Sequence, residues 1–241
     1  AIIAQAIATL GEMFPGRLWV AMGSGEASNE HITGERWPDK PTRNARLFEC
    51  VEVVRALLRG EEVTHDGLVR VDRARLWTLP PTPPPLVGAA LSVETARWCG
   101  GWADGLITVN MPADQLRAIV DAFREGGGEG RPVRVQVKVA WADSEDAALA
   151  GAYDQWRTNV FDSALMADIE RVEQFEVAAT HVRPEDVTTA VLTSADLGRH
   201  ASWLREILDL GVDEVFVHHV PKEQAAFIDA YGAKVLPEVA G

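Results

Sequence analysis

Apolar positions along the chain switch between helical and strand spacing. Ile3, Ile7 and Leu10 recur at i, i+4 and i+7, which predicts an amphipathic helix over the first dozen residues, ended by Gly11 and then Pro15-Gly16. Five short runs predict strands, at 17–22, 86–89, 105–109, 133–141 and 214–218. The run at 17–22 has no polar alternation, as expected for a strand covered on both faces, whereas 133–141 alternates in part and is the clearest strand by propensity. Helical spacing predicts further helices over 42–59, 92–102, 114–124, 197–210 and 224–236.

Two segments interrupt this alternation. Residues 61–76 place Asp66-Gly67 between two short runs of β-type residues, which predicts a hairpin. Residues 142–195 are mostly helical in pattern and longer than a simple connection, so we expect a helical insertion there. The triple glycine at 126–128 is expected to be a loop.

Strands that alternate with helices predict a parallel sheet in an α/β fold. Five strands fit either part of an α/β barrel or a doubly wound open sheet. No G-x-G-x-x-G fingerprint opens a helix after a strand, which counts against a dinucleotide-binding open sheet. The spacing of the strands alone does not decide between the two architectures.

Composition excludes several classes of partner. The 241 residues are 47% hydrophobic and 24% charged, as in ordinary globular proteins, and the formal net charge is −13. Because such a surface repels phosphate backbones and anionic lipids, we expect no nucleic-acid or membrane partner. Cys50 and Cys99 lie in no disulfide or metal-ligand spacing, so we expect free thiols, a reducing compartment and a cytoplasmic protein.

Two strand ends carry candidate chemistry. Residues 22–30 (MGSGEASNE) follow a strand, and glycines there let the backbone approach a flat ring closely; the alternative is a plain glycine-rich turn with Glu26 in solvent. Residues 88–92 (GAALS) lead into a helix N-terminus, which can bind an anion or simply be capped by Ser92. At most one of His218 and His219 can face the interior, and the other four histidines lack zinc spacing, so no metal is expected.

Three segments resemble one family. AQAIATLGEMFPGRLWVAMGSGEASNE, CGGWADGLITV and DEVFVHHVPKEQAAFIDAYGAKVLPEV are similar to the luciferase-like monooxygenase superfamily, in particular to its branch of F420-dependent glucose-6-phosphate dehydrogenases. The resemblance implies an α/β (β/α)8 TIM barrel of bacterial-luciferase type, of which residues 1–241 form a single, N-terminally incomplete domain. Only about the last five βα units are recognised, so roughly 80 to 90 residues are expected to be absent at about 30 per unit.

The resemblance also implies a flavin- or F420-dependent oxidoreductase or monooxygenase that acts on a small organic substrate, with FMN or coenzyme F420 as cofactor. Glu26 matches the proton donor of F420-dependent relatives. The residues matching cofactor contacts are Ser24, Gly25, Asn29, Ala89, Ala90, Leu91 and Ser92. Asn110 and His218 are candidate substrate contacts, and a homodimer is expected.

Two departures from the branch matter. Leu91 and Ser92 stand where F420-using members usually have paired glycines, which brings the segment nearer to flavin-using members. Asn110-Met111-Pro112 stands where the sugar-phosphate dehydrogenases have a lysine, so glucose 6-phosphate is not the expected substrate. The alternative to an enzyme is a non-catalytic flavin-binding protein, or a truncated barrel subunit that pairs with a partner chain through its open strand edges.

Overall fold

The computed structural model describes residues 1–239 and contains one sheet of six parallel strands. These strands are β1 (Val20–Met22), β4 (Leu86–Ala89), β5 (Leu106–Val109), β6 (Val133–Ala140), β7 (Leu192–Thr193) and β8 (Glu214–His219). They lie in the order β1-β4-β5-β6, and both β7 and β8 pair with β6. The predicted parallel sheet is therefore confirmed. β7 was not expected, because two residues are too few to give an apolar run.

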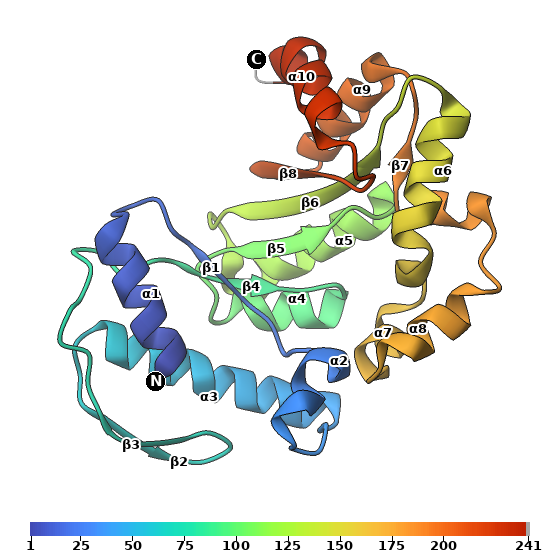
Figure 1. Ribbon diagram of the computed structural model, residues 1–241. Helices are drawn as coiled ribbons and strands as arrows, with labels where there is room; N and C mark the ends of the chain where they lie inside the picture. The colour runs from blue at the N-terminus through green and yellow to red at the C-terminus, as the bar shows by residue number, and fades with distance from the viewer. Residues whose placement is uncertain (240–241) are drawn as a thin grey trace.

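Helices follow the strands and cover one side of the sheet (Figure 1). They are α1 (Ile2–Met13), α3 (Lys40–Leu58), α4 (Val93–Gly100), α5 (Ala113–Phe123), α9 (Leu197–Leu208), α10 (Gln224–Lys234) and α11 (Leu236–Val239). The helix predicted over the first dozen residues is confirmed. Two other predictions were wrong: the last helix is divided at Val235, and residues 124–128 form a π-helical turn, η2 (Arg124–Gly128), where a loop was expected at 126–128.

The two interruptions have the expected character. The hairpin consists of β2 (Val63–Asp66) and β3 (Arg70–Ala74), which pair antiparallel in a small sheet of their own. The insertion contains α6 (Glu145–Trp156), η3 (Arg157–Asn159), α7 (Ser163–Asp168), α8 (Val172–Ala179) and η4 (Pro184–Thr189). Part of it packs around a second apolar cluster formed by Ala140, Ala152, Val187, Val191 and Val220.

Strand β6 shows how the sequence divides the two faces of the sheet. Its four valines, at positions 133, 135, 137 and 139, are at most 1% exposed and belong to the main hydrophobic core. Because neighbouring side chains on a strand point to opposite faces, Arg134, Gln136 and Lys138 lie on the other face. That second face is the interior of the curved sheet, and it carries polar and charged groups as well as apolar ones.

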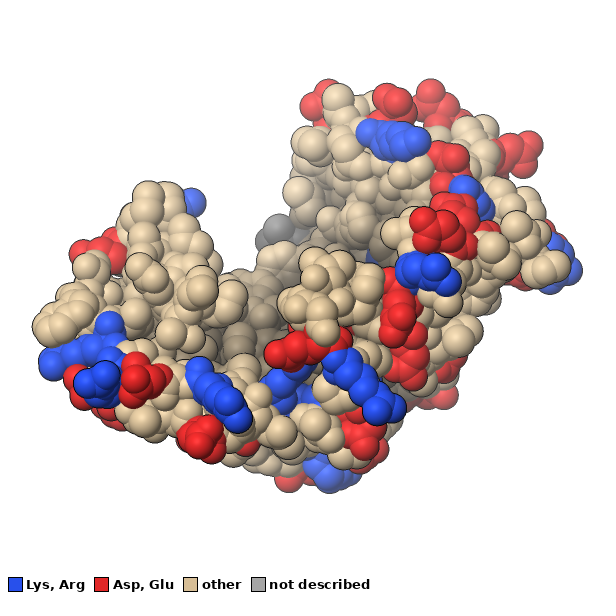
Figure 2. Space-filling view, turned by 60° about the horizontal axis from the view of Figure 1, so that its bottom comes forward, with Lys and Arg blue, Asp and Glu red and all other residues tan. Residues whose placement is uncertain are grey.

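The sheet is an open arc over the described residues, since β1 pairs only with β4 and β8 pairs only with β6. Figure 2 shows the consequence, a molecule hollowed between the side that holds α1 and the side that holds α9 and α10. Parallel strands with helices outside and an open interior are the arrangement of an incomplete α/β barrel. Within residues 1–239, none of the helices has the length and apolar character needed to cross a membrane.

Candidate functional site

A cleft of about 1160 Å³ lies at the carboxyl ends of the first strands, on the interior face of the sheet. Carboxyl ends of parallel strands are the face on which α/β barrels carry their active sites. The cleft brings together two of the predicted segments, 24–29 and 89–92, which are more than 60 residues apart in sequence. The predicted cofactor and proton-donor residues that line it are Ser24, Gly25, Glu26, Asn29, Ala89, Ala90, Leu91 and Ser92.

Small residues form the floor of the cleft where β1 and β4 end. Met22 pairs with Gly88, so Gly23 lies beside Ala89, and a Cβ on Gly23 would meet the Ala89 Cβ at 3.8 Å. Gly25 has a φ of +79°, a left-handed conformation that favours glycine, and directs the chain into the short helix α2 (Ala27–Glu30). Glu26 is the N-cap of α2, and its side chain is exposed in the cleft.

The second segment is held by a helix cap. The Ser92 hydroxyl oxygen accepts a hydrogen bond from the Thr95 N–H at 3.3 Å and donates to the Thr95 hydroxyl at 3.0 Å. The main-chain N–H of Ala90 donates to Ile107 at 3.0 Å, which ties the same turn to β5. The predicted capping role of Ser92 is therefore confirmed. The exposed faces of Ala89 and Leu91 form this wall of the cleft.

Three further cleft residues form a contact that the sequence did not predict. Trp37 donates its indole N–H to Asp168 Oδ1 at 3.0 Å, and the Arg43 guanidinium lies 4.4 Å from the centre of the Trp37 ring. Arg43 is 7% exposed and lies 3.7 Å from Asp168. The contact joins the start of α3 to α7 in the insertion across 131 residues of sequence, so no local pattern could reveal it.

The interior face continues in registered rows toward the carboxyl ends of the strands. Ile107 pairs with Arg134 and Arg134 with Glu214, and the guanidinium of Arg134 is bonded to the Glu214 carboxylate at 2.7 Å. The next row holds Val109, Gln136 and Phe216, all of which line the cleft. Lys138 and His218 are paired in the row after that.

Asn110 and His218, the expected substrate contacts, lie outside the lining of the cleft. The Asn110 amide donates to the main-chain oxygen of Ala190 at 3.2 Å and accepts from the N–H of Lys138 at 3.0 Å. Both ends of the side chain are therefore used, one by β6 and the other by the residue that follows η4. His218 lies with its ring centre 5.3 Å from that of Trp156, whereas His219 is buried and stacks on Phe227 at 4.0 Å.

Comparison with known proteins identifies the family. The family model described as luciferase-like monooxygenase matches residues 1–214, most of the chain. The F420-dependent glucose-6-phosphate dehydrogenase of Nakamurella multipartita is 31% identical over 247 aligned positions, which cover 99% of this chain and 73% of that protein. This chain belongs to the luciferase-like monooxygenase family.

One further relative and two solved structures are also similar to this chain. The F420-dependent hydroxymycolic acid dehydrogenase of Mycobacterium tuberculosis is 29% identical, over 99% of this chain and 66% of that protein. A solved F420-dependent secondary alcohol dehydrogenase, in complex with an F420-acetone adduct, superposes with a TM-score of 0.90 at 24% identity, over 99% of this chain and 74% of the other. An EDTA monooxygenase from Chelativorans superposes with a TM-score of 0.70 at 16% identity, over 99% and 70%. The expected luciferase-type barrel is thus confirmed, here as part of a barrel.

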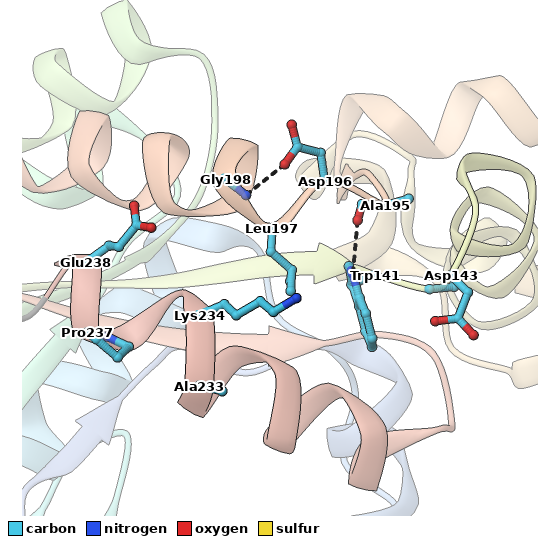
Figure 3. A pocket seen from close by; sticks show the side chains of 11 residues that line it. Trp141, Asp143, Ala195, Asp196, Leu197, Gly198, Ala233, Lys234, Pro237 and Glu238 are labelled. Carbon is cyan, nitrogen blue, oxygen red and sulfur yellow. Dashed lines mark hydrogen bonds between the residues drawn. The ribbon is translucent and has the colours of Figure 1, made fainter.

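A smaller pocket of about 610 Å³ in this luciferase-like chain lies between the end of β6, the start of α9 and the last two helices (Figure 3). Three of its polar side chains already have partners. The Trp141 indole donates to the Ala195 oxygen at 3.1 Å, Asp196 accepts from the Gly198 N–H at 2.8 Å, and Glu238 is paired with Arg205 at 2.6 Å. The larger cleft, which brings the predicted segments 24–29 and 89–92 together, is the candidate functional site.

Proposed function

We propose that this chain is an oxidoreductase that uses coenzyme F420, with FMN as the alternative cofactor, and acts on a small organic substrate. The observation that carries the proposal is the cleft that brings residues 24–29 and 89–92 together at the carboxyl ends of β1 and β4. The TM-score of 0.90 to an F420-dependent enzyme, against 0.67 to a monooxygenase solved with FMN, supports F420 over FMN.

The residues of the cleft fit a flat ring system. Its volume of about 1160 Å³ slightly exceeds the roughly 300–1,000 Å³ of typical small-molecule sites, as a cofactor together with a substrate would require. Gly23 and Ala89 give the floor no bulky side chain, and Trp37 supplies an aromatic wall. Leu91, which is 50% exposed, stands where F420-using relatives usually have glycine. Its side chain narrows the cleft on the β4 side without closing it.

Each segment has a separate task in this proposal. Ser24, Gly25 and Asn29 hold the cofactor from the β1 side, and the turn Ala89–Ser92 holds it from the β4 side. Glu26 exchanges a proton with the cofactor or the substrate, because its exposed carboxylate lies in the cleft. When bound, a deazaflavin supplies hydride transfer and a flavin can also supply oxygen chemistry.

The substrate-facing side is assigned to the interior beyond the cofactor segments. The Asn110 side chain is bonded to Ala190 and to Lys138, and Met111 carries no charge, so glucose 6-phosphate is not the proposed substrate. His218 belongs to the same interior face as Phe216 and can contact a substrate that extends past the cleft. We also propose that residues 1–241 form a single domain, that the protein is a homodimer, and that it acts in the cytoplasm.

Titration of the purified chain with F420 and, separately, with FMN tests the proposal through absorbance and fluorescence. We expect saturable binding of F420, weakened by Asn29→Ala and prevented by Ala89→Leu, which fills the floor. Glu26→Gln should retain cofactor binding but lose turnover. The control is Glu35→Gln, which should change neither, because the Glu35 side chain is 77% exposed and lies outside the lining of the cleft. Binding of neither cofactor would refute the proposal and favour a subunit that acts only with a partner chain.

A further inference from the structure

Lys138 and His218 extend the interior face beyond the cleft. They are register partners on β6 and β8 and stand two residues after Gln136 and Phe216, which line the cleft. Residues two apart on a strand share a face, so Lys138 and His218 lie on the same face as Gln136 and Phe216. Two residues advance about 6.6 Å along a strand. The pair is therefore about one small-molecule length from the cleft, on its carboxyl-end side.

Trp156, the last residue of α6, completes this group. The centre of the Trp156 ring lies 5.3 Å from the centre of the His218 ring. The Lys138 ammonium nitrogen lies 6.0 Å from the same Trp156 ring centre. The Trp156 Nε1 and the His218 Nδ1 are both buried, and within residues 1–239 neither has a hydrogen-bond partner. The side chains of Trp156, His218 and Lys138 thus lie together, and we call this group the donor cluster. An indole N–H and an ammonium can only donate, and a histidine can donate from Nδ1.

Within residues 1–239, no carboxylate forms an ion pair with Lys138. Its side chain is 9% exposed, and burial alone lowers its pKa. Arg134, on the same strand and face, differs: it is bonded to Glu214 at 2.7 Å and lies 5.0 Å from the Trp19 ring. Asn110 cannot balance Lys138 either, because its amide is neutral. A largely buried lysine without an ion-pair partner loses part of the hydration of its charge, and an anion in contact with it offsets that cost.

We propose that the donor cluster of Lys138, His218 and Trp156 binds a carboxylate of the substrate, so that the substrate of the proposed oxidoreductase is a small organic acid. The cluster holds one cation, since burial keeps the pKa of His218 below its ordinary value and Lys138 lowers it further. One cation with two neutral donors matches a singly charged carboxylate and its two oxygens. A doubly charged phosphate would need a second cation. The proposal rests on the proposed function only for the reaction, because anion binding can be measured without cofactor.

Three probes with a common phenyl ring separate charge from shape: benzoate, its neutral analogue benzamide, and phenyl phosphate. Calorimetric titration of the cofactor-free chain at pH 7 should show saturable binding of benzoate, with benzamide weaker by about tenfold or more, the usual effect of a charged hydrogen bond. Lys138→Met should weaken benzoate by about the same factor. Lys138→Arg should restore part of the affinity, and Lys222→Met, a lysine 72% exposed, should leave it unchanged.

Each result has one consequence. Lys138-dependent benzoate binding supports the proposal. Equal binding of benzoate and benzamide, or no effect of either Lys138→Met or Lys138→Gln, overturns it, and tighter binding of phenyl phosphate than of benzoate overturns the carboxylate assignment. Titration of the same preparations with F420 and FMN is the independent arm. Cofactor binding without benzoate binding overturns only the donor cluster, and benzoate binding without cofactor binding overturns only the proposed function.

Discussion

Substitution of Gly100 by alanine tests the contact that holds helix α4, and with it the cleft turn 89–92, in place. Gly100 is the last residue of α4, and a Cβ there would lie 2.3 Å from the main-chain oxygen of Phe123 and 2.7 Å from the carbonyl carbon of Gly126. Both atoms belong to the backbone of the α5–η2 region, so neither can rotate away as a side chain does. Gly101→Ala is the matched control: its Cβ would be 3.4 Å from the nearest atom, and its φ of −74° suits alanine.

The size of the effect follows from these distances. Overpacking of a core contact costs about 1–3 kcal/mol, and two backbone clashes place Gly100→Ala at about 3 kcal/mol. The better helix propensity of alanine returns up to about 1 kcal/mol, which leaves a net loss of about 2 kcal/mol. A chain of this size loses roughly 2–4 °C of Tm per kcal/mol, so we expect Tm to fall by about 4–8 °C. Gly101→Ala should gain about 0.4–1 kcal/mol, because alanine restricts the unfolded chain more than glycine does.

Urea unfolding followed by circular dichroism measures both variants, and the midpoint concentration should fall in Gly100→Ala at an unchanged slope m. Because α4 begins directly after Ser92, displacement of the helix should also weaken cofactor binding in this variant alone. Equal midpoints for Gly100→Ala and Gly101→Ala would refute the reasoning, since the close approach would then carry no energy. A lower midpoint with unchanged cofactor affinity would refute the link between α4 and the cleft.

Three further outcomes are expected. Burial lowers the pKa of His200 below its ordinary value of 6.5, so the unfolded chain takes up this proton first. The free energy of unfolding should therefore fall as pH drops below about 6.5, and urea midpoints at several pH values should fall less steeply in His200→Gln. Burial raises the pKa of Cys99 to about 12, so this thiol should react with iodoacetamide at pH 8 only when the chain unfolds. Cys50 is only partly buried and should be labelled faster than Cys99, which mass spectrometry of the treated protein measures. Asp168→Ala should change Tm by less than about 3 °C, because Asp168 is exposed. It should nevertheless speed amide hydrogen exchange in α7, because the hydrogen bond from Trp37 that holds this helix is lost. Unchanged exchange in α7 would contradict this role of Asp168.

The main elements of the fold could be predicted because each buries a continuous apolar face. The four valines of β6 occupy every second position, and the core stripe of α3 includes Leu47, Val51, Val54 and Leu58. Elements without such a face were missed. β7 has two residues and is held by pairing with Val139 and Ala140, a contact that exists only once the chain has folded. The turn η2 was missed because its close approach to Gly100 determines its shape, and glycines alone indicate only freedom.

The candidate site also contains parts that a local pattern predicts and parts that only the folded chain brings together. Residues 24–29 and 89–92 could be predicted as strand ends, since each motif is local and parallel strands bring their carboxyl ends together. The contact of Trp37 and Arg43 with Asp168 could not be predicted, because it depends on where the insertion places α7. The tasks assigned to Glu26 and Asn29 stay predictions until the titrations are done.

The net charge of −13 and the proposed binding of an organic acid are compatible, because they act over different distances. Charges on the surface are screened over about 8 Å at physiological salt, so the total charge governs extended partners such as nucleic acids and membranes. A small anion at the interior face of the sheet responds instead to the nearest groups, and Lys138 there is largely buried and without an ion-pair partner in the described chain. Added salt should therefore weaken benzoate binding far less than it weakens an exposed pair such as Lys222 with Asp154. A steep loss of benzoate affinity between low and high salt would place the anion at the surface and contradict its assignment to Lys138.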